Sequence, residues 1–291
     1  MAANFPCGVP LEEFILYQKD LPMCSPEVER RLKLANQLVR EAGSIILKYF
    51  QTDLFELQKK GDGSPLTIAD QETEQFLRSG IEGLFPEDSI VGEEFDDKQG
   101  ETEVRWILDP IDGTKSFISG VPLFGTMIGV EIAGKPTIGS VYFPALDEGV
   151  YASSGRGAWH FCRDETPVQA KVSTNSNMAE AVIVTSEAET FAVRDAVDVW
   201  GALTDASYFA RTWGDVFGYM LVATGRVDVM IDPELKIWDA AAVQPIIEEA
   251  GGRFTDWAGT PSIDAGEAIG SNGAIHEQVL QFTRSKAGYF A

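Results

Sequence analysis

The chain has 291 residues, of which 44% are hydrophobic and 23% are charged, as in globular proteins with one large domain or two interlocked ones. Acidic residues outnumber basic residues by 45 to 23, which gives a formal net charge of -22. Such a surface repels nucleic acids and anionic membranes, and it disfavours anionic substrates unless bound cations reverse the charge locally. Part of the acid excess is equally well explained by solubility or by a salty habitat.

The cysteines and the amino-terminal residues give no indication of export. Cys7, Cys24 and Cys162 form no CxxC pair, which favours a reducing compartment. No basic region precedes an apolar core near the start, and no stretch approaches the about 20 apolar residues of a membrane span. We therefore expect a cytoplasmic protein. Residues 1–24 are rich in proline and are expected to be an irregular extension to a domain that covers 25–291.

Two helices are expected first along the chain. Ser25-Pro26 is typical of a helix start, with a capping serine before a proline. Apolar residues then recur at helical spacing, which predicts a long amphipathic helix over about 26–50. A turn-rich loop occupies 59–65. The second helix is expected to begin near Thr67 and to end before Pro86.

Strands dominate the middle of the chain, where runs of β-branched and aromatic residues alternate with Gly and Pro. Strands are expected at 89–91, 104–108, 125–132, 137–143, 149–152, 181–185, 227–231, 253–256 and near 268–269. Further helices are expected at 188–200, 215–224, 238–250 and near the last residues. Because helices and strands occur in blocks without regular βαβ spacing, the pattern favours an α+β fold over a doubly wound parallel sheet.

The segment 106–114 carries the clearest chemical signal. An apolar run ends in Asp109 and Asp112, and a Gly113-Thr114 turn follows. Buried carboxylates that stay ionised need a compensating charge, and hard divalent ions such as Mg²⁺ take oxygen ligands of this kind. The turn can direct backbone N–H groups and a hydroxyl toward an anion. The segment therefore indicates a metal on one side and a phosphate on the other.

Other acidic residues strengthen this indication. Glu93-Glu94 follows a strand end, Asp70 lies in the first turn of the second helix, and Asp239 opens an alanine-rich helix. Each also has a plainer explanation, which is a solvated turn for the glutamates and helix capping or a helix-dipole interaction for the two aspartates. Asp109 and Asp112 could likewise form a turn. Together, several carboxylates at the ends of buried elements suit a site for two or three metal ions that activates water and binds phosphate.

Other catalytic and phosphate-binding patterns fit poorly. The Asp-x-x-Asp spacing differs from the DxDx[TV] loop of haloacid-dehalogenase-type phosphatases, and neither GxxxxGK[ST] nor GxGxxG occurs in the sequence. Gly155-Arg156-Gly157 is too short for a phosphate loop and predicts a turn between strands. The two histidines, His160 and His276, are expected at a strand end and a helix start with structural roles. Mechanisms based on a histidine nucleophile, a triad or a histidine-rich zinc site are therefore disfavoured.

The sequence resembles the inositol monophosphatase-like family in five strings, which follow in order along the chain: Thr67–Gln71, Gly92–Glu94, Asp109–Thr114, Trp238–Ala241 and Gly251-Gly252. The resemblance covers about 26–290. It implies a layered αβαβα sandwich of the inositol monophosphatase and fructose-1,6-bisphosphatase type. It also implies an enzyme, usually a homodimer, that hydrolyses phosphate monoesters with Mg²⁺.

The resemblance assigns metal-binding roles to particular residues. Glu93, Asp109 and the backbone carbonyl of Ile111 would hold a first Mg²⁺ ion. Asp109, Asp112 and Asp239 would hold a second. Glu93 would assist a third ion through water, so that two to three ions are implied.

The resemblance also assigns the chemistry. Asp70 and Thr114 would activate the attacking water, with Glu93 assisting through its metal. The N–H groups of Gly113 and Thr114 would cradle the phosphate. No covalent phosphoenzyme is implied, and positioning with charge neutralisation would account for most of the catalysis.

Two further strings, 115–126 and 211–215, are similar to the histidinol-phosphate phosphatase branch of the family. The position of Asp232 contacts the alcohol part of the substrate in this family, and that of Asp215 is small and neutral in inositol-preferring members. Two carboxylates that face the leaving alcohol suit histidinol phosphate, which carries an ammonium group and an imidazole. Arg211 resembles a substrate-contacting arginine of this branch.

We therefore expect a homodimeric L-histidinol-phosphate phosphatase of histidine biosynthesis, whose partner is a small phosphate monoester. One alternative is an inositol-1-phosphate phosphatase or a broader sugar or nucleotide phosphatase. Another is a non-catalytic, metal-binding regulatory protein, which is disfavoured because every expected metal ligand is present. Asp215 could instead cap a helix and pair with Arg211, and Trp213 is expected to pack in the core.

Overall fold

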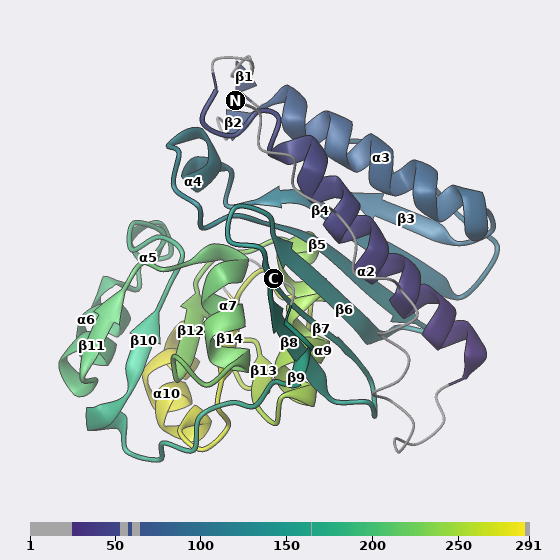
Figure 1. Ribbon diagram of the computed structural model, residues 1–291. Coiled ribbons are helices and arrows are strands. Elements are labelled where there is room, and N and C mark those ends of the chain that lie inside the picture. Colours follow the sequence, from purple (N-terminus) through teal and green to yellow (C-terminus); the bar gives the residue numbers. More distant parts are fainter. Residues whose placement is uncertain (1–24, 53–57, 60–64, 164, 289–291) are drawn as a thin grey trace.

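The computed structural model describes residues 25–52, 58–59, 65–163 and 165–288. Within these residues, two sheets alternate with three layers of helices (Figure 1). The layered α+β sandwich predicted from the sequence is confirmed. The expected extension at 1–24 and most of the expected loop at 59–65 lie outside the described residues.

The larger sheet has the strand order β3-β4-β5-β6-β7-β8-β9. Only β3 and β4 pair in parallel, and the remaining neighbours are antiparallel. The bounds are β3 Ser89–Gly92, β4 Val104–Asp112, β5 Gly125–Ile132, β6 Lys135–Phe143, β7 Glu148–Ser153, β8 Ala158–Cys162 and β9 Val168–Gln169. A short pair, β1 (Gln58–Lys59) and β2 (Pro65–Leu66), lies apart from this sheet.

The smaller sheet has the order β11-β10-β12-β14-β13, in which β11, β10 and β12 run parallel to one another. Its bounds are β10 Val182–Val184, β11 Phe209–Arg211, β12 Val229–Asp232, β13 Arg253–Thr255 and β14 Ala268–Ser271. The strands β11 in this sheet, and β8 and β9 in the larger one, were not predicted from the sequence. All three are only two to five residues long, so they carry little periodicity.

The three helical layers follow from the apolar faces of the helices. The first layer, α2 (Pro26–Ile46) and α3 (Ile68–Leu84), packs on one face of the larger sheet around Trp106, Leu108 and Ile128. The middle layer lies between the sheets and consists of α7 (Asp215–Ala223), α8 (Ile237–Ala241) and α9 (Val243–Glu249). The outer layer covers the smaller sheet with α5 (Thr190–Val193), α6 (Val197–Ala206) and α10 (His276–Thr283).

Three expected helices differ from the structure. The first ends at Ile46 instead of near residue 50, because the chain tightens into i→i+3 bonds and turns Phe50 onto Phe124, with ring centroids 4.8 Å apart. The helix expected at 188–200 is two helices, α5 and α6, separated by Asp195 in the left-handed conformation (φ 56°). The helix expected at 238–250 is interrupted at Ala242, because Pro245 has no N–H to donate to the preceding turn.

Turns and buried polar groups lock the sheets together. The segment Gly155-Arg156-Gly157 connects β7 to β8, as predicted, and its two glycine N–H groups each donate to Glu249 at 2.7 Å. His276 opens α10 and is fully buried between the hydroxyls of Ser271 (2.7 Å) and Thr255 (2.9 Å). Burial lowers the pKa of His276 to about 4, so the ring is neutral and structural. No helix in the described part of the chain is long and apolar enough to cross a membrane.

Close contact between the middle layer and the larger sheet depends on two glycines. A Cβ on Gly129 of β5 would lie 2.6 Å from the Cβ of Ala241, and one on Gly139 of β6 would lie 2.0 Å from the carbonyl oxygen of Ala242. Gly and Ala therefore allow the backbone that joins α8 to α9 to rest directly on the strands. This contact sets the depth of Asp239, which lies in α8.

A Gly139→Ala substitution tests the importance of this contact. The added methyl group has to push Ala242 away from the sheet, so we expect a loss of about 1–3 kcal/mol in the free energy of unfolding. Urea denaturation of the purified variant measures this loss. Gly201→Ala, in α6 with nothing within 4 Å of the new methyl group, serves as the matched control. It is expected to be neutral or to stabilise by up to about 1 kcal/mol, and equal losses in both variants would contradict the packing argument.

Candidate metal and phosphate site

Two parallel strands bring the first acids of the site to one edge of the larger sheet. Gly92 of β3 is the register partner of Leu108 in β4. Because the strands run in the same direction, Glu93 and Asp109 follow at the same edge. Their proximity is reflected in the pKa of Asp109, which burial and the charge of Glu93 raise well above the usual value.

An irregularity in β4 directs two acids toward the same place. Asp109 pairs with Met127 and Asp112 pairs with Gly125, and the register shifts between them. In a regular strand, residues three apart point to opposite faces, whereas a bulge changes this alternation. The interpretation of Asp109 and Asp112 as a turn is therefore wrong, since both lie within β4. Ile111 between them is buried in an apolar cluster with Phe117 and Phe124.

The third acid comes from α8. Asp239 lies in the first turn of this helix, where its Oδ2 accepts the N–H of Lys236 at 2.6 Å. One carboxylate oxygen from each of Asp109, Asp112 and Asp239 lies within 4.8 Å of the others. Asp109 is only 2% exposed, and its buried Oδ1 accepts no hydrogen bond from the described residues. A buried oxygen without a donor, beside two further carboxylates, fits a hard divalent cation.

The acids raise one another's pKa values. Burial, followed by the charges of Asp215 and Asp239, raises the pKa of Asp112 well above its usual value. Burial and the charge of Glu93 raise the pKa of Asp239 to about 7, although the N–H of Lys236 opposes the shift. Without a cation, the site therefore favours protonation of acids that are ordinarily ionised at neutral pH.

The turn after β4 is the segment expected to cradle a phosphate. Gly113 has a left-handed backbone (φ 82°) and precedes α4 (Thr114–Ile118), and the hydroxyl of Thr114 donates to the carbonyl of Ile111 at 3.0 Å. A side chain at position 113 would lie 2.9 Å from the carbonyl oxygen of Leu123 and 3.1 Å from Oδ2 of Asp215. Glycine is therefore required at this position both by its conformation and by the close approach of its neighbours.

Asp70 lies in the first turn of α3, where it is fully buried. Its Oδ2 accepts both the N–H of Thr67 at 2.7 Å and the hydroxyl of Thr67 at 2.6 Å, so a capping box starts the helix. The neighbouring Ala69 packs in the same apolar cluster as Ile111. The plainer explanation of Asp70, as an acid in the first turn of a helix, is thus correct for one of its oxygens. The plainer explanation of Asp239, as an N-cap, is wrong, because Lys236 is the N-cap of α8 and Asp239 lies in the first turn.

Two of the expected substrate residues, Asp215 and Asp232, lie where parallel strands of the smaller sheet end, together with Ser186, which was not predicted. Ser186 comes after β10, Asp215 comes after β11, and Asp232 ends β12, so all lie at one edge. Asp232 is 3% exposed and its two oxygens accept from the N–H of Ser186 (2.9 Å) and from the hydroxyl of Tyr219 (3.0 Å). Burial raises the pKa of Asp232 to about 6. Both carboxylate oxygens of Asp232 therefore accept hydrogen bonds within the protein. Asp215 is the more exposed of the two acids.

Asp215 occupies an unusual backbone conformation at the start of α7. Its φ is 55°, the preceding Gly214 is the N-cap, and its own N–H donates to the hydroxyl of Ser186 at 2.8 Å. The next N–H, of Val216, donates to Oδ2 of Asp112. Burial and the charge of Asp232 raise the pKa of Asp215 to about 7. The α7 start therefore joins the metal cluster to the substrate residues.

The plainer explanation of Asp215, as a helix cap paired with Arg211, is wrong. Arg211 is exposed, donates to the carbonyl of Ala210 at 2.7 Å and lies over the ring of Phe209, and no ion pair with Asp215 occurs in the described residues. The expectation that Trp213 packs in the core is also wrong, since this residue is 40% exposed and meets Phe209 edge to face.

Two residues that support the Glu93 segment escaped the sequence analysis. Glu74 is fully buried and accepts the N–H of Glu94 (2.8 Å) and Nε of Arg78 (2.7 Å), while Arg78 donates to the carbonyl of Phe95 (3.0 Å). A Cβ on Gly92 would lie 2.0 Å from Oε1 of Glu74. Asp70, Glu74 and Arg78 are spaced four residues apart and so lie on one helix face. This spacing is the signal in the sequence that could have revealed Glu74 and Arg78.

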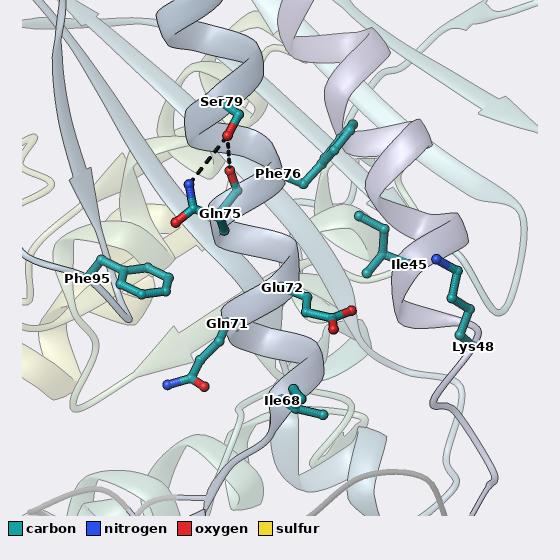
Figure 2. Close-up of a pocket in the computed structure, with 9 residues that line it drawn as sticks. All are labelled: Ile45, Lys48, Ile68, Gln71, Glu72, Gln75, Phe76, Ser79 and Phe95. Carbon is teal, nitrogen blue, oxygen red and sulfur yellow. Dashed lines mark hydrogen bonds between the residues drawn. The ribbon is translucent and has the colours of Figure 1, made fainter.

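A separate depression of about 520 Å³ lies between α2 and α3. Figure 2 shows its lining side chains, among which Lys48 and Glu72 are the only charged ones. None of the predicted metal, phosphate or substrate residues lines it. The depression is therefore distinct from the carboxylate cluster.

Comparison with known proteins places the chain among phosphatases. Residues 27–286 match the model of the inositol monophosphatase family. The histidinol-phosphatase of Chlorobaculum parvum is 40% identical, over 86% of this chain and 95% of the relative, and that of Mycobacterium tuberculosis is 35% identical, over 88% and 98%. The solved structure of the Thermotoga maritima IMPase superposes with a TM-score of 0.77 at 30% identity, over 88% of this chain and 98% of that one.

The raised pKa values predict a pH-dependent stability of the metal-free protein. Asp215 and Asp239, with pKa values of about 7, bind more protons in the folded than in the unfolded state, so stability should fall as the pH rises through that range. His276 acts in the opposite direction, but only below its usual value of 6.5. We therefore expect a lower Tm at about pH 8 than at about pH 6.5, and a larger gain in Tm on adding Mg²⁺ at the higher pH.

Thermal unfolding of chelator-treated protein, with and without Mg²⁺, measures both quantities. A gain in Tm that is the same at both pH values, or larger at the lower one, would contradict this account of the carboxylate cluster.

Proposed function

The chain belongs to the inositol monophosphatase family and is a phosphoric monoester hydrolase, and from this premise we propose that it hydrolyses L-histidinol phosphate. The observation that carries the choice of substrate is a pair of neighbouring acids. Oδ2 of Asp215 lies 3.1 Å from the position of a Cβ on Gly113, and Asp232 is close enough to raise the pKa of Asp215. Relatives named histidinol-phosphatase at 35–40% identity over most of both chains support the choice.

We further propose that the enzyme uses two to three Mg²⁺ ions. Glu93, Asp109 and the carbonyl of Ile111 would hold the first ion, and Asp109, Asp112 and Asp239 the second, with Glu93 assisting a third through water. The buried Oδ1 of Asp109, to which none of the described residues donates a hydrogen bond, supports this assignment. The bound ions would supply the positive charge that neutralises the phosphate oxygens and increases the acidity of water.

The residues around the cluster would carry out the proton transfer and orient the phosphate. Thr114 donates its hydroxyl hydrogen to Ile111, so the lone pairs of its oxygen remain to accept a hydrogen bond from the attacking water. Asp70, fixed by Thr67, would accept the proton of that water. The N–H groups of Gly113 and Thr114 would bind the phosphate oxygens as negative charge develops on them.

The acids on the alcohol side would select a cationic leaving group. Two neighbouring carboxylates with raised pKa values gain stability from a nearby cation, and an ammonium group supplies one. A neutral polyol such as inositol lacks this charge. Arg211, whose guanidinium donates to the carbonyl of Ala210 and lies over the ring of Phe209, would have to change its rotamer to contact the substrate.

The homodimer, the cytoplasmic location and the extent of the domain over 25–291 stay predictions.

A panel of phosphate esters tests the proposed function. We expect phosphate release from L-histidinol phosphate in the presence of Mg²⁺, with a kcat/KM well above that for inositol 1-phosphate. Release from inositol 1-phosphate but not from histidinol phosphate would favour the inositol-phosphatase alternative. No release from any ester would favour a non-catalytic, metal-binding protein.

An Asp112→Asn variant tests the assignment of the second metal. The neutral amide removes one negative ligand from the carboxylate cluster, so kcat should fall by about 100-fold or more. Mg²⁺ titration followed by thermal unfolding should show weaker metal binding in the same variant. Asp264→Asn, at an exposed loop position, is the matched control and should behave as the parent protein does. Near-normal activity of Asp112→Asn would contradict the assignment.

A further inference from the structure

Ser186, which was not among the residues singled out in the sequence, contacts both acids on the alcohol side of the site. Its N–H donates to Oδ1 of Asp232 at 2.9 Å, and its hydroxyl accepts the N–H of Asp215 at 2.8 Å. Thr185 beside it adds a longer bond to Asp232 at 3.4 Å. One residue after β10 therefore connects the end of β12 to the start of α7.

The contact with Asp215 coincides with a strained backbone. Asp215 has a left-handed conformation (φ 55°), which residues other than glycine rarely adopt. Such a conformation persists only where surrounding contacts hold it, and outliers of this kind concentrate at functional sites. Here the holding contacts are the N–H of Asp215 on Ser186 and the N–H of Val216 on Asp112.

The strained conformation determines where the carboxylate of Asp215 lies. Its Oδ2 is 3.1 Å from the position that a Cβ on Gly113 would occupy, at the turn expected to bind phosphate. Gly214 allows this arrangement, because a side chain there would lie 2.0 Å from Cα of Ser186. In a right-handed conformation, the Cβ of Asp215 would leave the backbone in a different direction.

We propose that Ser186 is a positioning residue for substrate specificity, which holds the Asp215 carboxylate toward Gly113 and the Asp232 carboxylate behind it. This inference rests on the proposed function, because the two acids matter for specificity only when the leaving alcohol is cationic. Ser186 itself does not have to touch the substrate. Its backbone bond to Asp232 survives any side-chain substitution. Removal of the hydroxyl takes away the acceptor for the N–H of Asp215 and the contacts that the hydroxyl itself makes with the two carboxylates.

Steady-state kinetics on two substrates tests the proposal. L-Histidinol phosphate has a cationic leaving group, and p-nitrophenyl phosphate has none. Ser186→Ala should raise KM for histidinol phosphate about tenfold, as expected for the loss of one hydrogen bond that places a charged group, with a much smaller effect on kcat and on p-nitrophenyl phosphate. Ser207→Ala is the matched control, since it removes a hydroxyl that donates to the carbonyl of Thr204, remote from these acids along the chain.

A double-mutant cycle with Asp215→Asn separates positioning from general stability. Asparagine tolerates the left-handed backbone but lacks the charge, so once it replaces Asp215, the further change Ser186→Ala should raise KM by less than about twofold. If Ser186→Ala folds poorly, Ser186→Cys replaces it in the test. This variant keeps nearly the size of the side chain but has a weaker hydrogen-bond acceptor, so its KM should be intermediate.

Three outcomes overturn the proposal: equal losses on both substrates, full additivity in the cycle, or an unchanged KM in both Ser186 variants. If one of these outcomes occurs but the parent enzyme hydrolyses histidinol phosphate, the proposed function still holds. A parent enzyme that does not hydrolyse histidinol phosphate refutes the proposed function, and the role of Ser186 with it.

Discussion

Mutual repulsion among buried carboxylates is the constraint on which the rest of this structure depends. Asp109, Asp112 and Asp239 bring ligand oxygens within 4.8 Å of one another, with Glu93 close enough to raise the pKa values of Asp109 and Asp239. Folding without a cation has to tolerate this repulsion, since uncompensated buried charge is costly. The surrounding structure must therefore hold the acids together by contacts that do not involve their charges.

Those contacts are backbone geometry and close packing. The register shift in β4 turns Asp109 and Asp112 toward one place, and Gly129 and Gly139 allow α8 to approach the sheet until Asp239 reaches them. Buried polar groups complete the support, as when Glu74 binds the backbone of the Glu93 segment. The two glycines and Glu74 are remote in sequence from the acids that they place, whereas the shift in β4 lies between Asp109 and Asp112 themselves.

The same principle extends to the alcohol side of the site. The start of α7 gives one N–H to Asp112 and another to Ser186, so the proposed catalytic cluster and the proposed specificity residues share one helix end. The contact of Val216 with Asp112 bears on the proposed reaction, and the contact of Asp215 with Ser186 bears on the proposed choice of substrate. The strained backbone of Asp215 is consistent with such a shared position, because strain of this kind needs support from several sides.

The sequence by itself determined the layered α+β class, most of the longer helices and strands, and the acids around which the site is built. These follow from local patterns: helical and strand periodicity, the helix start at Ser25-Pro26, and short strings that resemble a known family. Only the tertiary structure decided how the acids meet, through the β4 irregularity, and which residues support them, such as Glu74 and Ser186. The sequence also misassigned Trp213 and the helix boundaries near Asp195 and Pro245. The physical reason is the distance along the chain over which each interaction acts. Periodicity and capping act within a few residues. The faces to which the β4 side chains point, the approach of α8 to the sheet and the bond from the N–H of Asp215 to Ser186 depend on segments that meet only in the fold.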